Sequence, residues 1–274
     1  MNSDLLSPSQ IQKLRLLVSE KAINQGPGGN FSIKFENNGE DLLAIKASGK
    51  VLAQFTLEDF VVLKLSRLIS IDHSIRTLLP RNEIQYTEAL KTARSRLVES
   101  LLSMESGFHA LLMHKYVLHL HSISSVVFAS MQNEKLKTEF LKDMQVSKIE
   151  VELPGYELSY AIEKKLSQHS KDSPSVLFLQ NHGVVWADND FERLLEAVHN
   201  FERRFEEKFK LKSKLIEVEY GLNPALHKPM TPDAAVLLSN KTSDELRAEK
   251  FYDVLWLQVN LFKLRDDFRS LETL

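Results

Sequence analysis

Cysteine is absent from the 274 residues of this sequence. Without cysteine no disulfide can form and no thiolate can bind a metal, so a transition-metal site would have to use histidine and carboxylate side chains. A chain without disulfides fits a reducing compartment, and we therefore expect a cytoplasmic protein.

Long apolar segments are missing as well. No run approaches the roughly 20 consecutive apolar residues that a membrane-spanning helix needs. Residues 1–10 are polar and contain no basic segment followed by an apolar one, so we expect no signal peptide. Hydrophobic residues make up 43% of the chain and charged residues 26%, which is typical of a globular protein with a large buried core.

Neither sign of charge is in excess. The chain has 35 Lys and Arg residues against 37 Asp and Glu residues, a formal net charge of -2. Because no basic excess would attract a polyanion or an anionic lipid surface, we expect neither nucleic acid nor a membrane as a partner. A small anionic substrate would need a local pocket of hydrogen-bond donors.

Strand and helix patterns alternate along the chain without an internal repeat or a low-complexity linker. Apolar residues at helical spacing predict helices, and short apolar runs predict strands. The predicted helices are 8–24, one that starts at 56, 85–113 with a break near 103–107, 122–132, 156–168, 190–214 and one from 243 onward. The predicted strands are 31–35, 42–46, 115–121, 149–153, 176–180 and 184–187, and residues 70–82 read as irregular.

The order of these elements predicts an α/β fold over residues 1–216, with helices on both faces of a mostly antiparallel sheet. Residues 217–274 are expected to form a C-terminal helical extension of the same domain. Two local signals support the assignment: Ser7 can cap a helix that starts with Pro8, and Asn37-Asn38-Gly39 is typical of a hairpin turn.

Histidine is concentrated in the middle of the chain, where six of the nine residues fall between positions 109 and 182. His119 and His121 lie two residues apart on a predicted strand, so both side chains project to the same face and could bind one metal ion. The alternative is that one of them packs in the core and the other is solvated.

A third histidine, His182, directly follows an apolar strand in the segment Gln180-Asn181-His182-Gly183. Gly183 would let the backbone come close to whatever His182 binds, whereas the alternative is an exposed histidine in a turn. Three imidazoles would leave an open position on the metal, which is typical of a catalytic site where the ion acts as a Lewis acid.

Glu105 is the candidate acid or base beside such a metal. It lies where the long predicted helix is interrupted, so the alternative is a carboxylate that caps a helix. His109, four residues further, is interpreted as a core residue or as one that supports the metal ligands from outside.

Two glycine-containing turns could bind a phosphate group. Gly29-Asn30-Phe31-Ser32 and Ser48-Gly49 offer backbone amides, an amide side chain and hydroxyl groups, and such concave arrangements bind anions without net positive charge. The alternative is that each is only a turn.

The motifs occur in a fixed order along the chain: GNFS, KASG, SMESGFH, HLH, PGYEL and QNHG. This ordered set, over roughly residues 8–215, resembles the class II aldolase/adducin family, whose enzymes include fuculose- and rhamnulose-phosphate aldolases. The run ESGFHALLMHKYVLHLHS is the most specific part of the resemblance.

The resemblance implies a three-layer α/β/α fold, usually a homotetramer with active sites at subunit interfaces. It implies one divalent metal per subunit, zinc first among the candidates, on His119, His121 and His182, with Glu105 as the acid/base. It also implies a substrate phosphate group bound by Gly29, Asn30, Ser32, Ser48, Gly49 and Ser103.

The implied activity is that of a lyase in carbohydrate metabolism, the reversible aldol cleavage of a phosphorylated ketose through a metal-stabilised enediolate. A sugar-phosphate epimerase or dehydratase on the same scaffold is the first alternative, and a non-catalytic adducin-like binding module is the second. Two features depart from the family pattern. Met104 stands where a second hydroxyl residue is common, and no tyrosine lies between Tyr116 and Tyr156 to act as proton donor.

Overall fold

The structure is a computed structural model of the chain. It describes residues 5–75, 83–95, 100–131, 134–141, 145–166, 175–215, 231 and 249–264.

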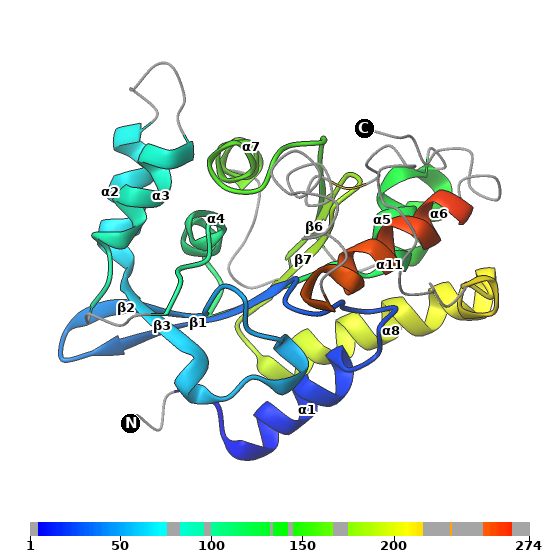
Figure 1. The fold of residues 1–274 in the computed structure, drawn as a ribbon, viewed down its shortest axis with the longest axis horizontal. Helices are drawn as coiled ribbons and strands as arrows, with labels where there is room; N and C mark the ends of the chain where they lie inside the picture. The colour runs from blue at the N-terminus through cyan, green and yellow to red at the C-terminus, as the bar shows by residue number, and fades with distance from the viewer. Residues whose placement is uncertain are drawn as a thin grey trace.

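A seven-stranded sheet forms the middle of the molecule, with the strand order β3-β2-β1-β4-β7-β6-β5 (Figure 1). Neighbouring strands run antiparallel except for β5 and β6, which are parallel, so the expected mostly antiparallel sheet is confirmed. The strands are β1 (Asn30–Asn37), β2 (Glu40–Lys46), β3 (Phe60–Lys64), β4 (Tyr116–Leu120), β5 (Gln145–Ile149), β6 (Ser175–Leu179) and β7 (Gly183–Asp188).

Helices cover both faces of this sheet and give three layers (Figure 1). One face packs against α1 (Pro8–Val18), α5 (Ile123–Ser130), α6 (Glu134–Phe140), α8 (Phe191–Phe209) and α11 (Glu249–Leu264) in a single core cluster. The other face carries α2 (Leu65–Ile75), α3 (Glu83–Lys91), α4 (Ser106–Leu111) and α7 (Tyr156–Leu166), with two core clusters of its own. Because apolar side chains alternate between the faces of each strand, both faces are buried.

The local signals read from the sequence are present in the structure. Ser7 accepts a hydrogen bond from the Gln10 backbone and completes a capping box at the start of α1. Asn38 and Gly39 both have positive φ, 54° and 78°, as a two-residue turn between β1 and β2 requires. Asp190 caps α8, which ends at Phe209, earlier than expected, because Lys210 adopts the left-handed conformation.

Several predicted boundaries are wrong. Thr56 begins only a short 3-10 turn (Leu57–Asp59) that leads into β3, because the β-branched Val61 and Val62 pair with β2. The strand expected at 149–153 lies at 145–149, where it can pair with β6. Residues 65–75, partly expected to be irregular, form α2, whereas 76–82 lie outside the described residues.

The long helix expected over 85–113 is two helices: α3 ends at Lys91 and α4 begins at Ser106, and residues 96–99 between them lie outside the described residues. Two further short 3-10 turns complete the described elements, Leu52–Gln54 and Lys212–Lys214.

The C-terminal helix α11 packs against α5 and joins the core cluster on that face through Trp256, Leu257, Leu261 and Leu264. Residues 216–230 and 232–248, which the expected extension includes, lie outside the described residues, so the division at residue 216 stays a prediction. None of the described helices is long and apolar enough to cross a membrane.

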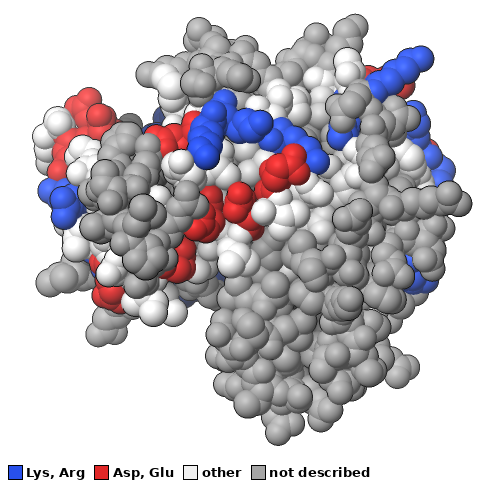
Figure 2. Space-filling view, turned by 90° about the horizontal axis from the view of Figure 1, so that it is seen from above, with Lys and Arg blue, Asp and Glu red and all other residues white. Residues whose placement is uncertain are grey.

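The described surface carries charges of both signs. On the face drawn in Figure 2, basic and acidic side chains lie in short neighbouring groups, and the described residues of this face form no broad field of one sign. This distribution matches the near balance of charges in the sequence.

Candidate metal centre

Strand β4 brings two histidines to the middle of the sheet. It lies between β1 and β7, and its apolar residues alternate: Leu118 and Leu120 join the α5 and α8 face, while Val117 joins the α4 and α7 face. His119 therefore projects toward α4, and His121 follows directly after the strand. Both are buried.

His182 reaches the same place from the tight turn that joins β6 to β7. Its N–H donates to Leu179 O over 3.0 Å, and Asn181 before it adopts the left-handed conformation, with φ of 57°. The register pairs Leu120 with Val184, so the start of β7 lies beside the end of β4. Gly183 is needed here because a Cβ would collide with Leu120 O.

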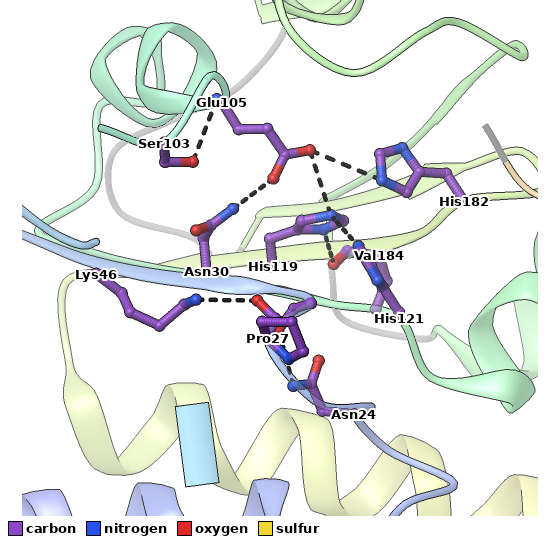
Figure 3. A network of polar contacts seen from close by, with 11 residues as sticks. Asn24, Pro27, Asn30, Lys46, Ser103, Glu105, His119, His121, His182 and Val184 are labelled. Carbon is purple, nitrogen blue, oxygen red and sulfur yellow. Dashed lines mark hydrogen bonds and ion pairs between the residues drawn. The ribbon is translucent and has the colours of Figure 1, made fainter. Parts of the chain in front are cut away.

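The three imidazoles converge (Figure 3). One ring nitrogen of each lies within 4.8 Å of the others, and His121 Nε2 lies 3.0 Å from His119 Nε2. Nitrogens bound to one tetrahedral zinc ion at 2.0–2.1 Å are about 3.3 Å apart. The cluster could therefore hold a divalent metal with little rearrangement.

The environment keeps His119 in the form that binds a metal. Its Nδ1 lies 3.0 Å from Val184 O, so Nδ1 carries the proton that it donates, and the lone pair of Nε2 faces the cluster. Burial, followed by the neighbouring His121 and His182, holds the pKa of His119 well below its usual range. The ring is thus neutral at neutral pH.

Glu105 lies against this cluster. Its Oε1 is 3.6 Å from His119 Nε2 and 3.7 Å from His182 Nε2. Glu105 occupies the N-cap position of α4 with φ -89° and ψ 3°, but its side chain makes no capping hydrogen bond, contrary to the helix-cap alternative. Its carboxylate instead faces the imidazoles, and its backbone N–H donates to Ser103 Oγ over 3.3 Å.

Two glycines in the loop before β1 pack closely against the histidines. A Cβ on Gly28 would lie 2.8 Å from His121 Nδ1, and one on Gly29 would lie 2.7 Å from His119 O. Gly29 also has φ of 69°, a conformation that favours glycine. Sequence reasoning assigned Gly29 to a phosphate site and missed Gly28, although the Gly-Pro-Gly-Gly run marked the loop.

The residues predicted to bind phosphate do not share one environment. Asn30 donates to Glu105 Oε2, whereas the fully buried Ser32 hydroxyl lies 2.7 Å from His109 Nδ1. The Ser48 N–H donates to Leu101 O over 2.9 Å, which brings the Ser48–Gly49 turn next to the passage that contains Ser103. The structure therefore groups the turn with Ser103 and keeps Ser32 beneath α4.

Two lysines near the cluster, the buried Lys46 and the half-buried Lys34, were not anticipated. Lys46 Nζ donates to Pro27 O over 3.1 Å and to Lys50 O over 2.6 Å, joining the two glycine turns. Burial lowers the pKa of Lys46 to about 8, against the opposing effect of the Glu105 and Asp59 charges. It therefore places a largely protonated ammonium group between the turns.

The second, Lys34, supports α4. Its Nζ donates to His109 O over 2.7 Å and to His114 O over 3.0 Å, and burial lowers its pKa to about 7. The His109 ring stacks on Phe108, which in turn meets the His119 ring edge-on. His109 thus lies behind the three clustered imidazoles, and its supporting role stays a prediction.

The family model described as class II aldolase and adducin N-terminal domain matches residues 9–208. The fold is similar to the N-terminal class II aldolase domain of a conserved protein from Thermoplasma acidophilum, with a TM-score of 0.62 and 19% identity over 76% of this chain and 96% of that one. It is also similar to a sugar-phosphate aldolase from Thermotoga maritima, with a TM-score of 0.52 and 15% identity over 77% of this chain and 97% of that one.

An L-fuculose 1-phosphate aldolase is similar too, with a TM-score of 0.50 and 17% identity over 77% of this chain and 90% of that one. At such identities the likeness to solved structures concerns the fold. No curated protein sequence matches the chain significantly. The family model, which spans most of the chain, decides the assignment: the chain belongs to the class II aldolase and adducin N-terminal domain family.

Proposed function

We propose that this protein is a metal-dependent aldolase that cleaves a phosphorylated ketose reversibly. One observation supports the proposal above all. The Oε1 atom of the buried Glu105 lies 3.6 Å from Nε2 of His119 and 3.7 Å from Nε2 of His182, and both histidines belong to the cluster of three. A structural metal site would not need a carboxylate in this position, whereas a lyase needs a group that moves a proton beside the metal.

His119, His121 and His182 would hold one divalent ion per subunit, zinc being the first candidate. When bound, the ion would act as a Lewis acid on a carbonyl and an adjacent hydroxyl oxygen and would stabilise negative charge that develops there. The three buried imidazoles would supply three ligands, which leaves open positions on the ion for substrate oxygens.

Glu105 would move the proton. In the cleavage direction the hydroxyl of the departing fragment would give its proton to water, the carbon–carbon bond would break, and that fragment would leave as an aldehyde. The bonding electrons would stay on the hydroxyl-bearing carbon next to the carbonyl group. Glu105, in its protonated form, would then deliver its proton to this carbon and become a carboxylate. In the synthetic direction the carboxylate removes that proton.

The phosphate group would lie at the Ser48–Gly49 turn, near Ser103 and Gly29. This location is supported by the buried Lys46 ammonium group, which joins the two turns and places positive charge behind them. The names of the similar sugar-phosphate and fuculose 1-phosphate aldolases favour a phosphorylated sugar. The homotetramer and the cytoplasmic location stay predictions.

The first part of the test measures the metal content of the protein. Elemental analysis of the purified protein is expected to give one equivalent of a divalent metal per chain, and His119→Ala is expected to lose it. His199→Ala is the matched control, because His199 is exposed on α8 outside the cluster. Full metal retention by the His119 variant would contradict the ligand assignment.

The second part measures the reaction. Ketose 1-phosphates are incubated with the protein, and free aldehyde is followed with a coupled reductase. Aldehyde release supports the aldolase. Conversion of one sugar phosphate into its epimer without free aldehyde would identify an epimerase, and loss of water without aldehyde would identify a dehydratase. A metal-free, inactive protein would favour the non-catalytic module.

A further inference from the structure

The strand register puts Asn30 beside His119. These two residues are direct partners in the antiparallel pair of β1 and β4, so their side chains project to the same face at neighbouring positions. Glu105 lies over this pair, as Figure 3 shows. Four segments therefore meet at one carboxylate: the start of β1, strand β4, the turn between β6 and β7 with His182, and the N-terminus of α4.

The two oxygens of this carboxylate have different partners. Oε2 accepts a hydrogen bond from Asn30 Nδ2, whereas Oε1 faces the Nε2 atoms of His119 and His182 at 3.6 Å and 3.7 Å. A hydrogen bond to an ionised carboxylate is stronger than one between neutral groups. Since Glu105 is 5% exposed and Asn30 6%, water competes little for this contact.

The Asn30 contact opposes another orientation of the same side chain. Glu105 is the N-cap residue of α4, where the first N–H groups of the helix lack helical acceptors and attract a carboxylate. The Glu105 side chain makes no such capping bond. The hydrogen bond from Asn30 is a contact that directs the carboxylate toward the histidines and away from the helix end.

We propose that Asn30 is a positioning residue for Glu105: its amide N–H holds Oε2 so that Oε1 faces the metal-binding nitrogens. The inference rests on the proposed function, since it assumes that a metal binds to the three histidines. It adds a second role to the predicted phosphate contact of Asn30, because one N–H of its buried side-chain amide is directed at the carboxylate.

Cobalt(II) tests this without a substrate, since its visible absorption changes when a nearby carboxylate enters or leaves the metal environment. The apoprotein is titrated with Co2+, and the spectrum and the dissociation constant are recorded for the wild type, Glu105→Ala, Asn30→Ala and Asn30→Asp. Asn30→Asp has nearly the same shape but no N–H donor. Far-UV circular dichroism checks that each variant is folded.

Both Asn30 variants are expected to give spectra that move toward that of Glu105→Ala. Their Co2+ affinity is expected to fall by roughly 10- to 100-fold, as is usual when a residue that orients a metal-site group is removed. Asn260→Ala is the matched control, because Asn260 is also a buried asparagine whose Nδ2 donates one hydrogen bond, to Trp256 O in α11. It is expected to keep the wild-type spectrum.

The outcomes separate the two proposals. A wild-type protein that binds no Co2+ would overturn the metal site and the present inference with it. If Glu105→Ala differs from the wild type but both Asn30 variants do not, the metal site stands and the positioning role is wrong. A wild-type spectrum for Asn30→Asp alone would mean that shape rather than the N–H donor matters, which also contradicts the inference.

Discussion

Glu105 adopts φ -89° and ψ 3°, in a sparsely populated part of backbone space where many active-site residues lie. Glu105→Gln keeps the size of the side chain but removes its ability to accept a proton. We expect the variant to retain its metal and to lose turnover by roughly 10²- to 10⁴-fold.

The measurement is kcat beside metal content from the same preparation. Activity near that of the wild type would contradict the role of Glu105, whereas loss of metal would indicate that the carboxylate is mainly a ligand.

A substitution at Gly28 tests the metal site without changing a residue that would bind the metal. A methyl group there would lie 2.8 Å from His121 Nδ1, so Gly28→Ala should displace this imidazole or the loop. We expect zinc affinity to fall by roughly tenfold or more. Gly39→Ala is the control, since a methyl group at Gly39 meets no atom within 4 Å, although its φ of 78° makes the change strained. Competition with a chromophoric chelator measures both affinities, and equal affinities would contradict the expected collision.

At the residue scale, spacing and resemblance predicted the three histidines and Glu105, and the structure brings these four side chains together. The partner of Asn30 and the roles of Lys34 and Lys46 could not be predicted. These contacts join residues far apart in the chain, such as Asn30 and Glu105, and depend on strand register and on the position of α4.

At the scale of elements, the packing of α8 on α5 contains a buried carboxyl group. Glu202 on α8 accepts a hydrogen bond from Ser124 of α5, and burial raises the pKa of Glu202 to about 7. In the unfolded chain this carboxyl group ionises near 4.5. The folded state therefore holds the proton more tightly, and this group contributes a loss of stability as pH rises from about 4.5 to about 7.

We expect Glu202→Gln to remove this contribution. Relative to the wild type, the variant should gain stability between pH 5 and pH 8, by up to roughly 3 kcal/mol. Urea unfolding at several pH values measures the difference. Glu196→Gln, at an exposed position of the same helix, is the control. A difference that is constant with pH would contradict the buried-proton explanation.

Elements whose start or turn depends on adjacent residues were predicted well. Elements whose position depends on pairing with a distant strand were not. The capped start of α1 and the hairpin at Asn38 and Gly39 need only adjacent residues. Strand β3 and the position of β5 depend on pairing with β2 and β6, respectively. The two helices α3 and α4 pack differently, since α3 contacts α2 whereas α4 contacts both α2 and α7.

For the whole molecule, a metal bound to the three histidines would join β4 and the residue directly after it with the turn between β6 and β7. A metal that binds the folded but not the unfolded chain stabilises the fold by about 2.7 kcal/mol at a free concentration of 100 times Kd. We expect removal of the metal with a chelator to lower Tm by several degrees, and added zinc to restore it.

Differential scanning calorimetry measures this shift, with the His119→Ala variant as control because it should not respond to the chelator. An equal shift in both proteins would assign the effect to the chelator itself.

The sequence by itself determined the α/β class, the absence of thiolate chemistry, and the set of histidine and carboxylate residues that could share a site. These properties follow from composition and from the periodicity of side chains along a strand or helix. Only the tertiary structure decided that Glu105 turns from the helix end to the imidazoles, that Asn30 holds it there, and that Gly28 must lack a side chain. Each of these depends on the distance between segments far apart in the chain, which is set by strand pairing and close packing.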